Sequence, residues 1–127
     1  MRRTMLMAAT VLVTAVALIL TGTLSVNRAT QRAGMLLQAS AEAARWGDLG
    51  EAFRQMTALE GWWRQQAARL ELMTSHDALA DVRGGILDAL LCLSEGERVE
   101  FLRSCVDIGM ALERLRAAES PRLMNLF

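Results

Sequence analysis

Lysine and tyrosine are absent from the chain, and histidine and proline occur once each. All fourteen basic residues are therefore arginine, and fourteen acidic residues balance them to a formal net charge of zero. From Arg28 onward, twelve arginines are scattered among the fourteen acidic residues. A nucleic-acid-binding protein needs a concentrated basic face. The composition therefore argues against nucleic acid as a partner.

Cysteine is nearly as scarce, with only Cys92 and Cys105. No CxxC pair or Cys/His pattern of a zinc site is present. In a helical hairpin centred on Glu95-Gly96, the two cysteines would be displaced axially by roughly 9 Å. A disulfide needs Cα atoms within about 7 Å. We therefore expect two buried free thiols and no metal.

Enzyme motifs are missing as well. The chain has no phosphate-binding loop, no G-x-S-x-G and no HExxH. His76 lies beside Asp77 at a predicted helix N-terminus, and the sequence places no nucleophile near it. It is either a pH-responsive group or an exposed first-turn residue, and the second interpretation is favoured. We expect no catalytic residue, no cofactor and no small-molecule substrate.

What the chain does have is a long uncharged stretch, from Thr4 to Asn27, behind Arg2 and Arg3. As a helix, its 23 residues up to Val26 would be roughly 35 Å long, which is enough to cross a hydrocarbon core of ~30 Å. A cleaved signal peptide is the alternative, but its apolar region usually runs 7–15 residues and ends at a small-x-small site. The sites present here are poor. We therefore predict an uncleaved membrane anchor over residues 1–27 and a helical soluble domain over residues 28–127.

The orientation of this anchor follows from the flanking charges. Arg2, Arg3 and the α-amine precede the stretch, and Arg28 and Arg32 follow it. The positive-inside rule favours a cytoplasmic N-terminus by a small margin. We expect a single-pass protein of the cell membrane with an extracytoplasmic soluble domain.

Apolar residues recur at helical spacing almost throughout, and no strand-type alternation appears. The predicted fold is all-α, with a transmembrane and stalk helix over about 4–45 followed by a small antiparallel bundle of three further helices. Gly47 is expected after the end of the first helix, with Asp48 and Glu51 as a capping box. The second helix should place Phe53 on its apolar stripe, which runs from Leu49 to Met73.

The last two helices follow from similar signals. Thr74 is expected to cap the third helix, whose stripe runs from Leu79 to Leu93 and is widened by Leu87 and Leu91. Gly84-Gly85 inside it indicates close packing of a neighbour or a kink. Ser94 and Glu97 predict a capping box for the fourth helix, with Ser120-Pro121 ending it. The predicted seam of that helix consists of Phe101, Cys105, Ile108, Leu112 and Leu115.

Residues of a candidate interaction surface are the tryptophans and the C-terminus. Trp62 and Trp63 point about 100° apart on a helix, and only Trp63 fits the apolar stripe. Trp62 and Trp46 either pack on the first helix, which is favoured, or face a membrane or partner. Leu126 and Phe127 end a short apolar tail that is either a recognition peptide or, as we expect, folds back over apolar surface.

This layout resembles a small bacterial membrane-anchored family catalogued as a domain of unknown function, number four-three-six-three, which is common in spore-forming Firmicutes. The resemblance rests on Trp46-Gly47-Asp48, Trp63, His76-Asp77 and the ending from Glu119 to Phe127. The chain departs from the family in lacking lysine, in which such proteins are often rich. The resemblance implies a cell-envelope setting, with a link to sporulation, and implies no catalytic residues.

Two functions remain in view. The first is a membrane-anchored, non-enzymatic accessory protein that binds another envelope protein. The second is a secreted or anchored helical module that binds a peptide or lipid, for which eight methionines would supply adaptable apolar walls. A cavity of a few hundred Å³ between helices would favour the second.

Overall fold

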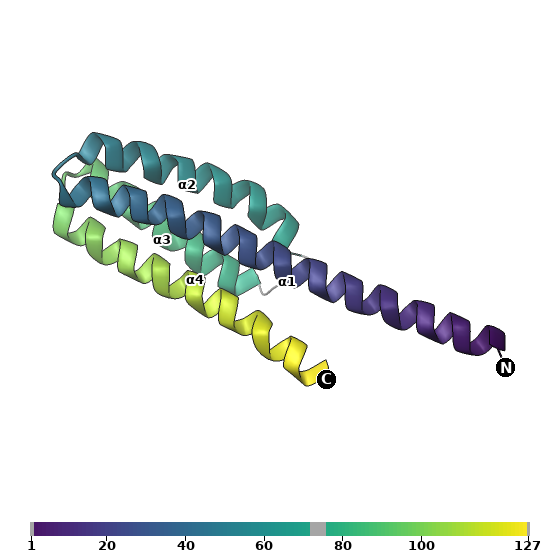
Figure 1. Cartoon of the computed structure of the whole chain (residues 1–127). Helices are drawn as coiled ribbons and strands as arrows, with labels where there is room; N and C mark the ends of the chain where they lie inside the picture. The colour runs from purple at the N-terminus through teal and green to yellow at the C-terminus, as the bar shows by residue number, and fades with distance from the viewer. Residues whose placement is uncertain (1, 72–75, 127) are drawn as a thin grey trace.

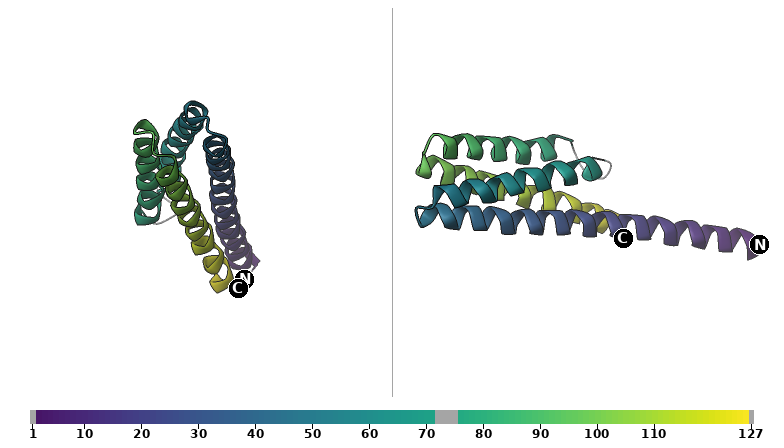
Figure 2. Two further views of the ribbon diagram at one scale, coloured as in Figure 1. Left: turned by 90° about the vertical axis from the view of Figure 1, so that its left-hand side faces the viewer. Right: turned by 90° about the horizontal axis from the view of Figure 1, so that it is seen from above.

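The computed structural model describes the backbone of residues 2–71 and 76–126, and the side chains of residues 2–17, 26–71 and 76–117. Over these residues the chain forms only helices, with no strand: α1 (Arg2–Arg45), α2 (Leu49–Leu70), α3 (His76–Ser94) and α4 (Arg98–Leu126). Helix α1 packs against α2 and α4, and α3 packs against the same two helices. Helices α1 and α3 therefore occupy opposite sides of an antiparallel bundle (Figure 2). The predicted all-α bundle is confirmed.

Helix α1 is longer than the bundle. Its 44 residues give a length of about 66 Å, and its N-terminal part projects beyond the other helices (Figure 1). Among the side chains that the structure describes from Val26 onward, the buried residues of α1 are mostly small and include Ala33, Ser40 and Ala44. Small side chains let the axes of neighbouring helices approach closely. Helix α1 can therefore pack closely against both α2 and α4.

The turn between α1 and α2 closes on Gly47, as the sequence predicts. Gly47 has a positive φ of 85° and donates its N–H to the carbonyl oxygen of Ala44 at 3.0 Å, while Asp48 donates to Ala43 at 2.9 Å. These two bonds make a Schellman motif. The Asp48 carboxylate then accepts the N–H of Glu51 at 3.0 Å and caps α2. One half of the predicted capping box is therefore present.

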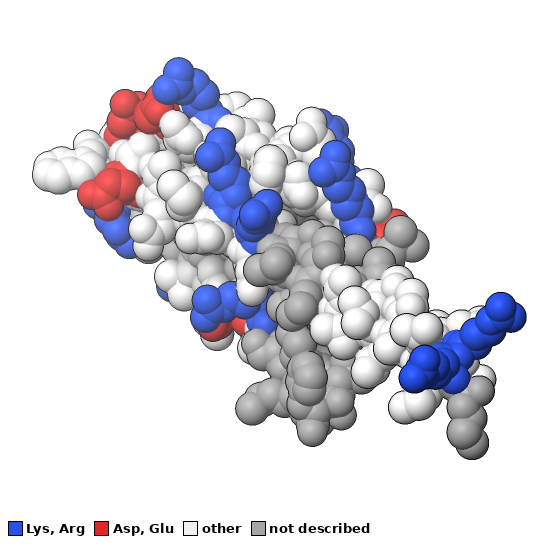
Figure 3. Space-filling view, turned by 45° about the vertical axis from the view of Figure 1, so that its right-hand side comes forward, with Lys and Arg blue, Asp and Glu red and all other residues white. Residues whose placement is uncertain are grey.

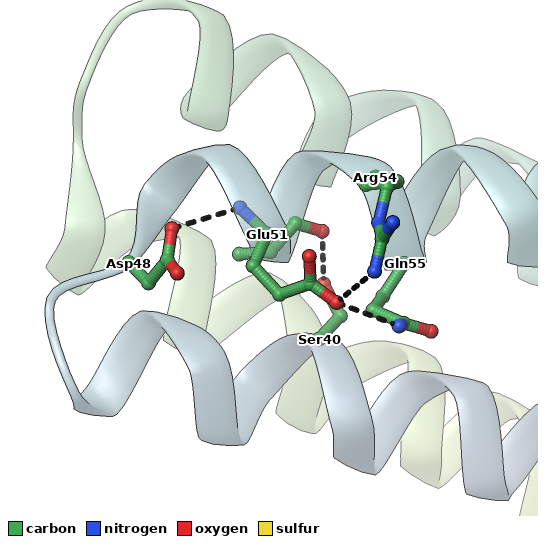
Figure 4. A network of polar contacts seen from close by, with 6 residues as sticks. Ser40, Asp48, Glu51, Arg54 and Gln55 are labelled. Carbon is green, nitrogen blue, oxygen red and sulfur yellow. Dashed lines mark hydrogen bonds and ion pairs between the residues drawn. The ribbon is translucent and has the colours of Figure 1, made fainter.

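The other half of that box is replaced by a side-chain network (Figure 4). The Glu51 carboxylate accepts hydrogen bonds from Arg54 at 2.8 Å and from Gln55 at 2.9 Å, one turn further along α2. The bond from Arg54, followed by that from Gln55, holds the pKa of the Glu51 carboxyl below its ordinary value. Beneath the network, the buried Ser40 hydroxyl donates to the Ala52 carbonyl at 2.6 Å and ties α1 to α2.

The turn between α3 and α4 repeats the first one and corrects the predicted capping box. Ser94 ends α3 instead of capping α4, and its hydroxyl donates to the Leu91 carbonyl at 2.8 Å. Gly96, with a positive φ of 73°, donates to Leu93, and Glu97 donates to Cys92. The Schellman motif at Gly96 satisfies the last carbonyls of α3. Helix α3 therefore includes Ser94, and Ser94 is not available as the N-cap of α4.

The two hairpins share one pattern of burial. Gly47 and Gly96 lie 49 positions apart, and at this offset most of the buried positions of α1 and α2 coincide with those of α3 and α4. The matching buried pairs are Ala33/Val82, Leu37/Ile86, Ser40/Ala89, Ala44/Leu93, Ala52/Phe101, Met56/Cys105, Leu59/Ile108 and Trp63/Leu112. The residue types differ while the positions agree, so the chain is a structural repeat of two αα-hairpins.

The core departs from the predicted stripes at three large residues. Phe53 is 45 % exposed, and Ala52 takes the buried position instead because Ser40 of α1 lies directly against it. Leu87 and Leu91, expected to widen the core of α3, are 48 % and 57 % exposed. The predicted seam of α4, in contrast, is buried at every one of its five positions.

Two helix ends need correction or fall outside the described chain. Helix α4 runs to Leu126, so Ser120-Pro121 does not end it and the last residues do not fold back as a separate tail. Proline removes one backbone donor, and the good helix formers on both sides of it sustain the helix. Helix α2 ends at Leu70. The expected cap Thr74 and the stripe residue Met73 lie outside the described residues.

The adjacent glycines of α3 are expected to respond to alanine in opposite directions. A Cβ at Gly85 would lie 2.8 Å from Cγ1 of Ile108 in α4, whereas a Cβ at Gly84 would meet nothing within 4 Å. Gly85→Ala should lower the free energy of unfolding by about 1–3 kcal/mol through overpacking. Gly84→Ala should raise it by about 0.5–1 kcal/mol through helix propensity. Urea unfolding at a concentration where the protein is monomeric measures both, and shifts of the same sign would contradict this account.

Candidate functional site

The described start of α1, residues 2–17, exposes apolar side chains on every side. Six of them are 65–74 % exposed: Met5, Leu6, Met7, Val11, Leu12 and Val13. The hydroxyls of Thr10 and Thr14 donate to the carbonyls of Leu6 and Thr10, each at 2.8 Å. Figure 3 shows this segment as a white surface between basic side chains at its end and the bundle. Such a surface needs an apolar environment or another protein to cover it.

Within the described residues, no helix combines the length and the apolar character required to cross a membrane.

A pocket of about 280 Å³ opens between α2 and α3. Its floor is apolar and includes Trp63, Leu79 and Ile86. Its rim is charged and consists of Glu60, Arg64, Glu71, His76 and Arg83. An apolar floor with ionic groups around it suits the chain of an amphipathic ligand with a polar end.

A larger and more open groove of about 980 Å³ lies between α1 and α4. Gly34 and Gly109 keep its floor free of side chains, and Met35 and Leu112 lie along it. Its polar lining comes from Asn27, Thr30, Gln31, Gln38, Glu113 and Arg116.

Of the predicted interaction residues whose side chains the structure describes, Trp63 and His76 line the pocket between α2 and α3, and Trp46 and Trp62 do not. Trp46 lies at the end of α1, 82 % exposed, and its indole N–H donates to the Glu42 carboxylate at 3.0 Å. The packing predicted for Trp46 is therefore wrong. Trp46 follows Arg45, the last residue of α1, and its ring is exposed to solvent. Trp63 is buried and donates to the Leu79 carbonyl across the core at 3.4 Å.

Trp62 packs on α1, as expected. Its ring is half-buried against the core, and the guanidinium carbon of Arg32 lies 5.8 Å from the ring centroid. Its indole N–H is buried without a hydrogen-bond partner. The side chains of Leu126 and Phe127 lie outside the described residues.

His76, the only histidine, lies in the first turn of α3. It is exposed, with Nδ1 3.7 Å from a Glu71 carboxylate oxygen. Among the described residues, no three His, Cys, Asp or Glu side chains converge in a way that could hold a metal ion. These residues could be singled out from the sequence. The pocket between α2 and α3 and the groove between α1 and α4 could not, because each depends on how two helices are spaced in the fold.

The thiols are free, and Cys105 is deeply buried while Cys92 is partly buried. Burial raises the pKa of the Cys105 thiol to about 12. At pH 8 we therefore expect iodoacetamide to label Cys92 well before Cys105 in the folded protein, and both in urea, as measured by peptide mapping. The raised pKa also means that Cys105 contributes stability that falls as pH rises from about 9 towards 12. Equal labelling of both thiols in the folded protein would contradict the burial of Cys105.

Comparison with known proteins finds no relative: no family model, no curated protein and no solved structure matches the chain.

Proposed function

We propose that the protein is a non-enzymatic interaction module of the bacterial cell envelope, anchored in the membrane by the start of α1. The observation that carries this proposal is the projecting helix. It is uncharged from Thr4 to Asn27 and exposes apolar side chains all round over the described residues 4–17. The hydroxyls of Thr10 and Thr14 are bonded to the helix backbone, so they add little cost in an apolar medium.

The bundle then lies next to the membrane on the far side from Arg2 and Arg3. Charges on the two sides of the uncharged stretch favour a cytoplasmic N-terminus and an outward-facing bundle. The absence of recognisable catalytic motifs supports binding over catalysis. The resemblance to the membrane-anchored family of spore-forming bacteria agrees with an envelope setting and a role linked to sporulation.

The α1–α4 groove is the surface that we assign to another envelope protein. Its lining on α1 begins at Asn27, the last residue of the uncharged stretch, and continues to Gln38. Its glycine floor and amide rim suit the backbone and side chains of a peptide segment. An envelope protein with a segment close to the bilayer surface is therefore the fitting partner.

A second candidate function is supported by the pocket between α2 and α3. Its volume of about 280 Å³ is near the lower end for small-ligand sites. A lipid or peptide with an apolar chain would contact Trp63 and place its polar end near Arg64 or Arg83.

Fractionation of the full-length protein tests the primary proposal. We expect protein with a C-terminal tag, expressed in a Gram-positive host, to remain in the membrane fraction at its full mass. The tag should be open to external protease in intact cells. A product shortened by about 25 residues in the medium would show a signal peptide instead and would favour the ligand-binding module.

A further inference from the structure

Helix α3 carries a second apolar stripe, on the side facing away from the core. Ala80, Gly84, Leu87 and Leu91 are all exposed and follow one another at spacings of four, three and four residues. This is the spacing of a coiled-coil seam, in which such residues meet the same stripe of another helix. The buried stripe of α3 is a separate set of residues: Leu79, Val82, Ile86, Ala89 and Leu93.

The outward faces of the other three helices differ from that of α3. Each carries exposed charges on that face: Arg28 and Glu42 in α1, Arg54 in α2, and Arg103 and Glu113 in α4. The stripe of α3 is uncharged from Ala80 to Leu91, and it includes two exposed leucines. The outward face of α2 is also uncharged over Thr57, Gly61, Gln65 and Ala68, but it has no large apolar side chain there. An uncharged outward stripe with exposed leucines is typical of a surface covered by a protein.

The residues beside the stripe indicate which protein covers it. In heptad terms Ala80 and Leu87 are d positions, Gly84 and Leu91 are a positions, His76 and Arg83 are g positions, and Asp81 and Asp88 are e positions. In a parallel pair, each g residue lies next to the e residue five positions later in the other helix. Arg83 then meets Asp88 of a second copy, and His76 meets Asp81. Each contact occurs twice because the pair is symmetric.

Three of these flanking charges have no ion-pair partner among the described residues of the single chain. Among the described residues, Arg83, Asp81 and Asp88 take part in no ion pair, whereas six other ion pairs form within or beside the helices. An antiparallel pair would place Asp81 beside Asp88 of the second copy, which brings like charges together. The charge pattern therefore favours the parallel arrangement.

We propose that a second copy of this chain docks on the outward face of α3 in parallel, with the seam Ala80, Gly84, Leu87 and Leu91. Ala80 and Gly84 allow close approach of the two backbones at one end, and the leucines interdigitate at the other. The resulting two-fold axis runs along α3, so both projecting α1 segments point the same way. This last agreement rests on the proposed function, because two anchors in one bilayer require a parallel pair.

Disulfide cross-linking of the full-length protein in membranes tests the arrangement. In a Cys92→Ser background, Leu91→Cys should give a covalent dimer on mild oxidation, because residue 91 faces itself in the parallel pair. Gln65→Cys, exposed on α2, is the matched control and should stay monomeric. Antiparallel pairing would instead join one Ala80→Cys chain to one Leu91→Cys chain when the two variants are mixed. That mixed dimer, or no cross-link at residue 91 above the control, would overturn the proposal.

Charge reversal in detergent provides the second measurement. Arg83→Asp should weaken dimerisation roughly tenfold or more by placing like charges together, and Arg83→Asp/Asp88→Arg should restore it. Circular dichroism should show unchanged helix content in each variant. A dimer of unchanged affinity in Arg83→Asp would contradict the parallel register. Cross-linking at residue 91 in protein that fractionates as soluble would leave the dimer standing and remove the anchor, whereas membrane protein without cross-links would remove only the dimer.

Discussion

Trp63→Ala is expected to lower the free energy of unfolding by about 3–5 kcal/mol, a large part of the stability of a domain of this size. The Trp63 ring is 1 % exposed and joins α2 to α3 through its bond to the Leu79 carbonyl. Alanine would leave a cavity between these helices and remove the donor that bridges them. Chemical denaturation followed by circular dichroism measures the loss.

Trp46→Ala is the matched control for this substitution. The Trp46 side chain is 82 % exposed, and its indole N–H donates to the exposed Glu42 carboxylate. Removing it should change stability by no more than about 0.5 kcal/mol. If the two tryptophan variants were equally unstable, the arrangement of α1 and α2 described above would be wrong.

Val13→Asp is expected to shift the full-length protein from the membrane fraction to the soluble fraction by roughly 100-fold. An aspartate near the middle of a membrane-spanning helix costs about 2.5–3.5 kcal/mol on insertion, and each 1.4 kcal/mol is tenfold. Residue 13 lies near the centre of the uncharged stretch and is exposed. Quantitative immunoblotting of both fractions measures the ratio.

Met35→Asp provides the control in the same helix. Met35 is as exposed as Val13 but belongs to the part of α1 that packs in the bundle. This variant should fractionate like the wild type. A Val13→Asp protein that stays in the membrane would mean that the bundle or a bound partner, and not the start of α1, holds the protein there.

Much of the fold was predictable because local rules decide it. The break at Gly47 needs a residue that tolerates positive φ, and Asp48 can cap only the helix that follows it. The seam of α4 from Phe101 to Leu115 follows from a strict spacing of four and three residues, and every member is buried. In these places the sequence leaves one low-energy solution.

The misses have a different cause. Ser94 carries a valid capping pattern, but Gly96 two residues later closes α3 by a competing motif that the pattern could not weigh. Phe53 fits a helical stripe, yet the close contact of Ser40 with Ala52 gives the buried position at the start of α2 to Ala52, while the rest of the stripe is buried as predicted. Both outcomes depend on contacts with neighbouring segments, and the residue pattern of a single helix does not contain that information.

The candidate site was less accessible still. Leu87 and Leu91 fit the core stripe of α3 and the outward seam about equally well from the sequence, and only the position of the neighbouring helices separates the two. The repeat of two hairpins could not be predicted from the sequence either, because the paired buried residues 49 positions apart differ in type.

The unbroken course of α1 from Arg2 to Arg45 has a mechanical consequence. A continuous helix transmits rotation as well as height, so the azimuth of the bundle is set by the number of residues between it and the start of the chain. Inserting one residue before Val26 would raise the bundle by about 1.5 Å and turn it by about 100°. The outward face of α3 would then point in a new direction relative to the first residues of α1. In the turns of α1 that precede Val26, substitutions should therefore be tolerated far better than insertions or deletions of a single residue.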